Sequence, residues 1–226
     1  MDIFSLISEK VDINLNIHKV LIELEMLDKE WRAGDIPLDE HKYGRIPREK
    51  DIKMWSIPRS SMKIITLLAI ANHAKVILDI GTSAGYSAIW LSVAAKINKG
   101  HVWATEIFEP KAKMAEHFFQ EAGVEEYITL YHGDIEAFFN KWNSKKQIDF
   151  ILFDADKENH LKYLKQCEKF INEGGIIVVD NASNFRGLMA DLLAYFDKSS
   201  NFITTVFDFD NGILAAIKKN LDNFNS

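Results

Sequence analysis

The stretch VILDIGTSAGYS at residues 76–87 decides the fold, because a run of aliphatic residues ends there in a glycine-rich turn. Val76 to Ile80 has the composition of a buried strand, and Gly81 and Gly85 follow it. Residues 84–97 are apolar almost all round, as in a helix packed tightly on a sheet. This order predicts the first βα unit of an α/β sheet, with a ligand beyond the carboxyl end of the strand.

Further along the chain, short β-branched runs alternate with helix-length segments, which indicates repeated βα units and a parallel sheet. The tail differs, because two strands there are separated by the turn sequence DFDNG, which predicts a hairpin. We therefore expect an α/β fold with a doubly wound, mostly parallel sheet and an antiparallel C-terminal edge. The later strands are predicted at residues 102–106, 128–131, 150–153, 176–179, 202–207 and 213–218.

The first 60 residues lack this regular alternation. Apolar residues recur at helical spacing over residues 3–28, which predicts two helices outside the sheet. Residues 32–60 contain three of the four prolines and are expected to be mostly loop, of the kind that often forms a lid or a substrate wall. At 226 residues we expect one domain.

Composition limits the partners and the compartment. Lys and Arg total 27 against 33 Asp and Glu, and this net charge of −6 disfavours broad attraction to phosphate backbones. The sequence shows no signal peptide and no apolar run long enough for a membrane span. Cys167 is the only cysteine, which excludes an intrachain disulfide and favours a reducing compartment. We expect a cytoplasmic protein.

The glycine turn can be compared with three known kinds of functional turn. A dinucleotide turn needs a second glycine where Ser83 stands, and a phosphate loop needs a lysine after Gly85, where Tyr86 stands. Gly81 to Gly85 does match the G-x-S-x-G elbow of α/β-hydrolases, which requires a later acid and then a histidine. The last histidine, His160, precedes the final strands. A hydrolase is therefore the weak alternative.

Acidic residues at the predicted strand ends favour another ligand. Asp79 before the turn and Glu106 after the second strand suit the cationic amino-acid part and the ribose diol of S-adenosylmethionine. Asp134, after the third strand, suits the exocyclic amine of adenine. Solvated strand ends and, for Asp134, an N-cap for the next helix are the structural alternatives.

Three motifs in order resemble one family. The run LDIGTSAGYS at residues 78–87, FDADK at 153–157 and Asp180-Asn181 are similar to the cation-dependent O-methyltransferases, which include catechol and caffeoyl-CoA O-methyltransferases. The resemblance implies a Rossmann-like class I methyltransferase fold. It covers a catalytic core at residues 58–219, preceded by a variable helical cap and loop at residues 1–57.

The resemblance also implies roles for single residues. Lys157 would be the catalytic base, acting beside Asp154. A divalent cation, Mg²⁺ or else Ca²⁺ or Mn²⁺, would be held by Asp154, Asp180 and Asn181, whose oxygens are ligands that hard cations prefer. Pairing of Lys157 with Asp156 at the surface is the structural alternative. The implied cofactor contacts are Ser61, Asp79, Gly81, Ser87, Glu106, Asp134 and Asp154.

The sequence departs from the family where the substrate would bind. The loop at residues 182–187 is longer and more polar, Asn211 replaces a frequent glycine, and Ser60-Ser61 also stand where glycine is frequent. We expect a small-molecule hydroxyl acceptor of the catechol or hydroxycinnamoyl kind. A hydroxylated tRNA base and a non-catalytic cofactor-binding role remain open, and the resemblance suggests a homodimer. Candidate pocket residues are Trp55, Arg59, Phe185 and Arg186.

Overall fold

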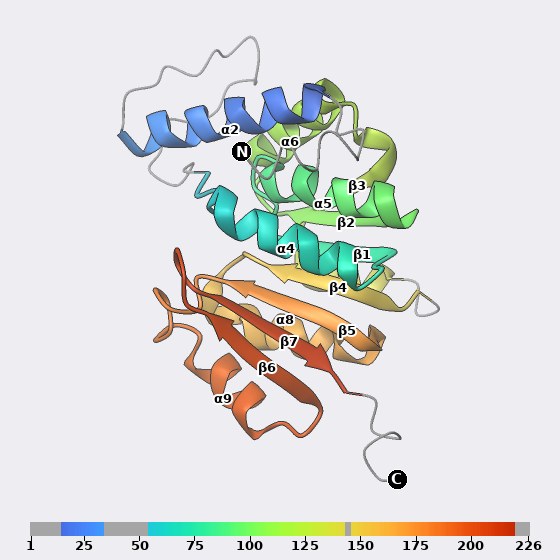
Figure 1. Cartoon of the computed structure of the whole chain (residues 1–226), viewed down its shortest axis with the longest axis vertical. Helices are drawn as coiled ribbons and strands as arrows, with labels where there is room; N and C mark the ends of the chain where they lie inside the picture. Colours follow the sequence, from blue (N-terminus) through green and yellow to red (C-terminus); the bar gives the residue numbers. More distant parts are fainter. Residues whose placement is uncertain (1–14, 34–53, 143–145, 220–226) are drawn as a thin grey trace.

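A computed structural model describes residues 15–33, 54–142 and 146–219 of the chain. Within this part, seven strands form one sheet in the order β3-β2-β1-β4-β5-β7-β6 (Figure 1). The first five strands run parallel, whereas β7 pairs antiparallel with both β5 and β6. The strands are β1 (Val76–Ile80), β2 (His101–Glu106), β3 (Ile128–His132), β4 (Ile148–Phe153), β5 (Ile171–Asp180), β6 (Phe202–Phe207) and β7 (Ile213–Lys218).

Helices cover both faces of this sheet. One face carries α4, α5 and α6, and α2 packs outside α5 and α6 at the end of the molecule remote from β6 (Figure 1). The other face carries α7, α8 and α9. The helices are α2 (Leu15–Ala33), α4 (Arg59–Ala71), α5 (Tyr86–Asn98), α6 (Glu109–Ala122), α7 (Ile135–Lys141), α8 (His160–Cys167) and α9 (Ala190–Lys198), with short 3₁₀ turns at η1 (Glu125–Tyr127), η2 (Lys157–Asn159) and η3 (Glu168–Phe170).

The strands divide their side chains between two hydrophobic clusters. Ile77 and Phe150 belong to the cluster beneath α4, α5 and α6, whereas Leu78 and Phe153 belong to the cluster beneath α7, α8 and α9. This division follows from the period of two along a strand. Because both faces are covered, the central strands are apolar on both sides, which explains their continuous aliphatic sequences.

The order of the strands places a binding site beside β1. From β1 the chain moves outward to β2 and β3, and it then returns to β4 on the other side of β1. In doubly wound sheets, ligands bind beyond the carboxyl ends of the strands at this reversal. The glycine turn after β1 and the acidic segment after β4 therefore meet at one edge of the sheet, where Asp154 N–H donates to Ile80 O at 3.0 Å.

The predicted fold class is confirmed, with differences at the element ends. The bounds of β1, β6 and β7 are as predicted, whereas α5 begins two residues late because Gly85 has φ +94°. The sequence interpretation missed α4, which begins within the expected loop region. One of the two predicted N-terminal helices corresponds to α2, while the segment before residue 15 and most of the expected loop lie outside the described residues.

None of the helices in the described ranges combines the length and the apolar character needed to cross a membrane.

Candidate active site

The glycine turn brings the backbone of β1 against the end of β4. Gly81 has φ +91°, and a Cβ atom built there would lie 2.7 Å from Asp154 O. The N–H groups of Gly81 and Thr82 both donate to Thr105 O, at 3.1 and 3.0 Å. Only glycine allows both this φ and this close approach, so the turn fixes the relative positions of three strand ends.

Ser83 stands where a dinucleotide turn would have its second glycine. It has φ +53°, its N–H donates to Glu106 Oε2 at 2.9 Å, and its Oγ donates to Met54 O at 3.1 Å. The other carboxylate oxygen of Glu106 accepts from Phe108 N–H at 2.7 Å. Two backbone N–H groups therefore hold the Glu106 carboxylate at the cavity wall. Each of them occupies one lone pair on one carboxylate oxygen, so each oxygen keeps a second lone pair.

Asp79 lies beneath the turn and is fully buried. Its Oδ2 accepts from Ser87 Oγ at 2.7 Å, while Oδ1 has no hydrogen-bond partner among the described residues. Burial raises the pKa of Asp79 to about 7, and the Ser87 and Thr82 hydroxyls oppose this rise. A buried carboxylate that lacks part of its hydrogen bonds destabilises the fold. Such groups are concentrated at functional sites, so Asp79 is a candidate for a functional role.

Asp134 has the role expected of an N-cap. Its Oδ1 accepts from Glu136 N–H at 2.7 Å and from Ala137 N–H at 3.4 Å, at the start of α7. It also lines the cavity, so the capping role and the predicted contact with adenine are compatible. One carboxylate oxygen serves the helix, which leaves Oδ2 for a ligand.

A cavity of about 710 Å³ lies along the carboxyl ends of the strands, which is within the size range of small-molecule sites. Its wall is contributed by the segments after β1 to β5, by the segment before α4 and by the β6–β7 turn. Predicted site residues that line it are Gly81, Glu106, Asp134, Asp154, Lys157, Asp180 and Asn181. Ser61, Asp79 and Ser87 are buried and do not line it.

An acidic cluster with one lysine occupies the ends of β4 and β5. Lys157 Nζ donates to Asp154 Oδ1 at 2.5 Å, and both side chains are largely buried. Asp156 instead accepts from Glu158 N–H and from Asn159 Nδ2. The alternative that Lys157 pairs with Asp156 is therefore wrong, because Asp156 caps the η2 turn.

Asp180 is buried beside Asp154. Burial and, to a smaller extent, the negative charge of Asp154 raise the pKa of Asp180 to about 7. Burial also raises the pKa of Asp154, against the opposing effect of Lys157. Asp180 Oδ1 has no hydrogen-bond partner among the described residues, and Asn181 has φ +65°. Two crowded carboxylates of this kind are expected where a cation binds.

The wall beside this cluster is tied to the β6–β7 turn. Ser60 Oγ and Ser61 Oγ both donate to Asp210 Oδ2, at 2.5 and 2.8 Å. Asn184 Nδ2 donates to Asn211 Oδ1 at 2.7 Å, and both of these asparagines line the cavity. Ser61, whose contact with a cofactor stays a prediction, holds the turn that presents Asn211.

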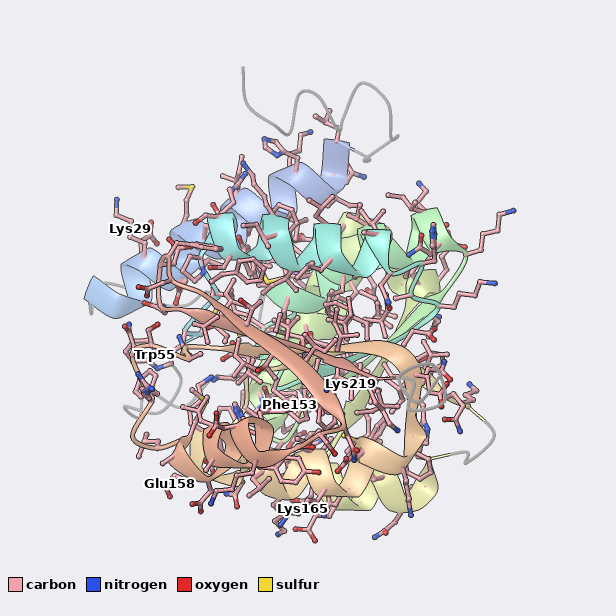
Figure 2. All side chains as sticks on the ribbon, turned by 60° about the horizontal axis from the view of Figure 1, so that its bottom comes forward. Lys29, Trp55, Phe153, Glu158, Lys165 and Lys219 are labelled. Atoms are coloured by element: carbon pink, nitrogen blue, oxygen red, sulfur yellow. The ribbon has the colours of Figure 1, made fainter. Side chains whose placement is uncertain are left out.

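The candidate pocket residues separate into two pairs. Trp55 and Phe185 line the cavity and are 60% and 44% exposed, and Figure 2 shows Trp55 at the outside of the molecule, whereas Phe153 lies inside. Arg59 does not line it, because its guanidinium binds both carboxylate oxygens of Glu25 at 2.8 and 2.9 Å. Arg186 also stays outside the cavity lining.

Lys111 is a cavity residue that sequence reasoning missed. It lies in the first turns of α6, where burial lowers its pKa while the nearby Glu106 and Asp154 carboxylates raise it. Its position follows from α6 starting three residues after β2, at the same sheet edge as the other site residues. In the sequence, Lys111 resembles any lysine near the start of a helix. Only its short distance from Glu106 along the chain could have indicated that it lines the cavity.

The hydrolase alternative finds no support in this geometry. The hydroxyl of Ser83 donates to a backbone carbonyl, and the cavity lining contains no histidine among the described residues. His160 is fully buried against Phe153, and burial lowers its pKa to about 3. A nucleophile, a base and an orienting acid in hydrogen-bond reach are therefore not assembled.

The fold and the cavity together define a Rossmann-like protein of the class I methyltransferase type. Residues 42–209 match the model of a family described as O-methyltransferase, and the chain belongs to this family. The solved O-methyltransferase of Bacillus cereus in complex with SAH has a TM-score of 0.71 and 20% identity over 96% of this chain and 97% of that one.

Curated relatives are similar at the level of sequence. A catechol O-methyltransferase of Mycobacterium tuberculosis is 34% identical over 57% of this chain and 58% of its own length. A flavonoid 3',5'-methyltransferase of Vitis vinifera is 28% identical over 73% of this chain and 74% of its own length. The match thus spans just under three fifths of the first relative.

Proposed function

We propose that this protein is an S-adenosylmethionine-dependent O-methyltransferase that uses a divalent cation and acts on a small molecule with neighbouring oxygen groups. The observation that carries this proposal is that Glu106 and the glycine turn share one cavity with Asp154, Lys157, Asp180 and Asn181. The proposed cofactor site and the proposed metal site would therefore share one cavity, so that an acceptor bound to the metal could reach the methyl donor.

The cofactor would bind at the end of the cavity beside β1, β2 and β3, which we call the cofactor end and define by Gly81, Ser83, Glu106 and Asp134. The free lone pairs of Glu106 suit ribose hydroxyls, and Asp134 Oδ2 suits the adenine amine. Family membership and the SAH in the Bacillus cereus relative support this assignment. Asp79 and Ser87 lie behind the turn and would support it, and a direct contact of Ser61 remains a prediction.

The cation would bind between β4 and β5. In the described part, no three His, Cys, Asp or Glu side chains converge on a metal position, but Asn181 lines the same cavity as Asp154 and Asp180 and would supply a third oxygen. The buried, unpartnered Asp180 Oδ1 fits a cation, and oxygen donors suit Mg²⁺, Ca²⁺ or Mn²⁺. When bound, such an ion lowers the pKa of a coordinated hydroxyl and orients it.

Lys157 would move the proton. As a neutral amine it accepts the proton of the acceptor hydroxyl, and the acceptor oxygen then bonds to the methyl carbon as the carbon–sulfur bond breaks. The electron pair of that bond returns to sulfur, which leaves S-adenosylhomocysteine, a methyl ether and a protonated Lys157. In the free protein, Lys157 Nζ donates to Asp154 Oδ1, so a cation bound by Asp154 would compete with Lys157 for this carboxylate.

The acceptor would lie at the other end of the cavity, which we call the acceptor end and define by Asn181, Asn184, Phe185 and Asn211. The names of the relatives favour a catechol-like or hydroxycinnamoyl-type phenol. A hydroxylated tRNA base is the alternative acceptor, and a homodimer is the expected assembly. Turnover of tRNA that falls steeply with salt would favour the alternative.

A methyl-transfer assay tests the proposal. Labelled S-adenosylmethionine is incubated with a catechol panel or tRNA, with Mg²⁺ or with a chelator. We expect turnover on a catechol that the chelator abolishes. Cofactor binding without turnover on any acceptor would instead support a non-catalytic role, and turnover that is insensitive to chelation would contradict the metal.

A matched pair of variants tests the ligand assignment. Asp180→Asn keeps the shape of the side chain but removes one charge, so cofactor affinity should stay within about twofold while activity falls by roughly a hundredfold or more. Asp191→Asn, an exposed change on α9, is the control. Activity of Asp180→Asn equal to that of the control would contradict the assignment.

A further inference from the structure

The acceptor end carries a pair of amides with unused hydrogen-bonding groups. Asn184 comes from the segment after β5 and Asn211 from the β6–β7 turn, and Asn184 Nδ2 donates to Asn211 Oδ1 at 2.7 Å. Among the described residues, no further side-chain hydrogen bond involves either amide. Asn184 Oδ1 is therefore unused as an acceptor and Asn211 Nδ2 as a donor, and both residues line the cavity.

The backbone holds this pair in place. Asn211 O accepts from Ser183 N–H at 3.1 Å and from Asn184 N–H at 3.3 Å. Gly212, with φ +79°, packs so closely that a Cβ atom there would lie 2.6 Å from Ser183 N. Asp210 is fixed in turn by Ser60 and Ser61. Two loops that are far apart in the sequence thus form one preorganised surface, which reduces the cost of ordering it on binding.

The charges around this surface disfavour anions. Two cations line the described cavity wall. Lys157 is paired with Asp154, and Lys111 of α6 lies near Glu106 and Asp154. Asp156 lines the same cavity, and Asp210, whose carboxylate Ser60 and Ser61 hold, directly precedes Asn211 in the chain. A negatively charged substituent beside the amides would therefore lie near the Asp210 carboxylate, whereas the two lysines of the described wall lie toward Asp154 and Glu106.

We infer that the Asn184–Asn211 amide pair selects acceptors that carry an uncharged hydrogen-bonding substituent, such as a carboxamide, over acceptors that carry a carboxylate. A carboxamide can accept from Asn211 Nδ2 and donate to Asn184 Oδ1. A carboxylate can satisfy only the donor, and it places negative charge against the carbonyl oxygen of Asn184. This inference rests on the proposed function and names the substrate class for that site.

Two acceptors of nearly equal shape provide the test. We expect kcat/KM for 3,4-dihydroxybenzamide to exceed that for 3,4-dihydroxybenzoate by about tenfold, which is the effect of one to two hydrogen bonds.

Asn211→Lys supplies a cation and should lower this ratio at least about fivefold, while Asn184→Ser should reduce turnover of the benzamide alone by roughly threefold. Asn140→Lys adds the same charge on α7 outside the cavity lining and should leave the ratio unchanged.

Cofactor affinity separates misfolding from a change in specificity. Each variant should bind S-adenosylmethionine within about twofold of the natural chain, since the amides lie outside the cofactor end. Equal kcat/KM for the two acceptors would overturn the inference while leaving the proposed function intact, as would an unchanged ratio in Asn211→Lys with normal cofactor affinity. Cofactor binding with no turnover of either acceptor would overturn the proposed function and the inference with it.

Discussion

The cofactor end of the cavity is framed by backbone, whereas the acceptor end is framed by side chains on loops. At the cofactor end, Gly81 touches the chain after β4, and Glu106 is held by two backbone N–H groups. At the acceptor end, Asn184 and Phe185 are exposed, and they lie in the turns after β5 rather than in a regular element. Backbone geometry tolerates few residue types, while an exposed loop tolerates many. The first end therefore suits a fixed cofactor and the second a variable acceptor.

Substitution of Gly81 is the strongest way to break this difference. Gly81→Ala places a Cβ atom 2.7 Å from Asp154 O at a φ of +91°, so we expect a loss of about 3 kcal/mol of unfolding free energy and of measurable cofactor binding. Urea unfolding and calorimetric titration measure both.

Two other glycines separate the causes of this loss. Gly174 has φ +76° but open space around its Cβ position, so Gly174→Ala should cost only about 1 kcal/mol. Gly187 has open space and no positive φ, and Gly187→Ala should change stability by less than about 0.5 kcal/mol. Equal stability losses in all three variants would show that the approach to Asp154 is unimportant.

The buried carboxylate behind the turn gives the next largest effect, and it depends on pH. The pKa of Asp79 is raised from 3.8 to about 7, so the folded chain binds this proton more tightly than the unfolded chain. Its contribution to stability is full below about pH 4 and is lost as the pH rises through about 7. Asp79→Asn should therefore raise the stability of the cofactor-free protein at pH 8 by about 1–2 kcal/mol.

The same substitution should weaken cofactor binding, because the charge that Asp79 retains at pH 8 would no longer attract a cationic ligand. We expect a loss of about tenfold or more in affinity for S-adenosylmethionine. Unfolding curves at pH 6 and pH 8, with Ser87→Ala as a companion, measure the stability part. If Asp79→Asn were less stable than the natural chain at pH 8 yet bound the cofactor normally, the carboxylate would be structural rather than functional.

The two ends also differ in how much the sequence predicted. The bounds of β1 are as predicted, because its aliphatic run lies between Lys75 and Gly81. β5 begins five residues before its predicted start, since Gly174-Gly175 resembles a turn. In the structure, these glycines lie where the pairing of β4 with β5 is irregular. Ile148 pairs with Ile171 but Phe150 pairs with Ile176, so β5 has three extra residues between the two pairs. Periodicity cannot show such an insertion.

At the acceptor end, single residues could be proposed but their contacts could not. The sequence indicated Trp55 and Phe185 as pocket residues, and both line the cavity. It gave no sign that Ser61 holds Asp210, because these residues are 149 positions apart. It also missed α4, whose first turn follows Pro58 within a stretch that the prolines marked as loop. Contacts of this kind depend on the whole topology rather than on a local pattern.

Asp134 offers a smaller test of the cofactor end. Asn is as good an N-cap as Asp, so Asp134→Asn should leave the stability of the fold unchanged within about 0.5 kcal/mol. If Oδ1 continues to cap α7, the new Nδ2 replaces Oδ2 and presents a donor to the donor amine of adenine. We expect cofactor affinity to fall about fivefold. Asp134→Ala should lose both affinity and about 1 kcal/mol of stability. A normal affinity in Asp134→Asn would remove the adenine contact from the site.

Substitution of Ser61 has the smallest expected effect, and it tests whether Ser61 serves the cofactor end or the acceptor end. Its hydroxyl is fully buried and shares Asp210 Oδ2 with Ser60, so Ser61→Ala leaves the Ser60 bond in place. If Ser61 acts only through the β6–β7 turn, KM for the acceptor should rise about threefold, while the dissociation constant of S-adenosylmethionine stays within about twofold. A direct contact with the cofactor predicts the reverse pattern. Because Asp210→Asn weakens the same link without touching Ser61, it should reproduce the acceptor effect, and a cofactor effect confined to Ser61→Ala would reassign Ser61 to the cofactor end.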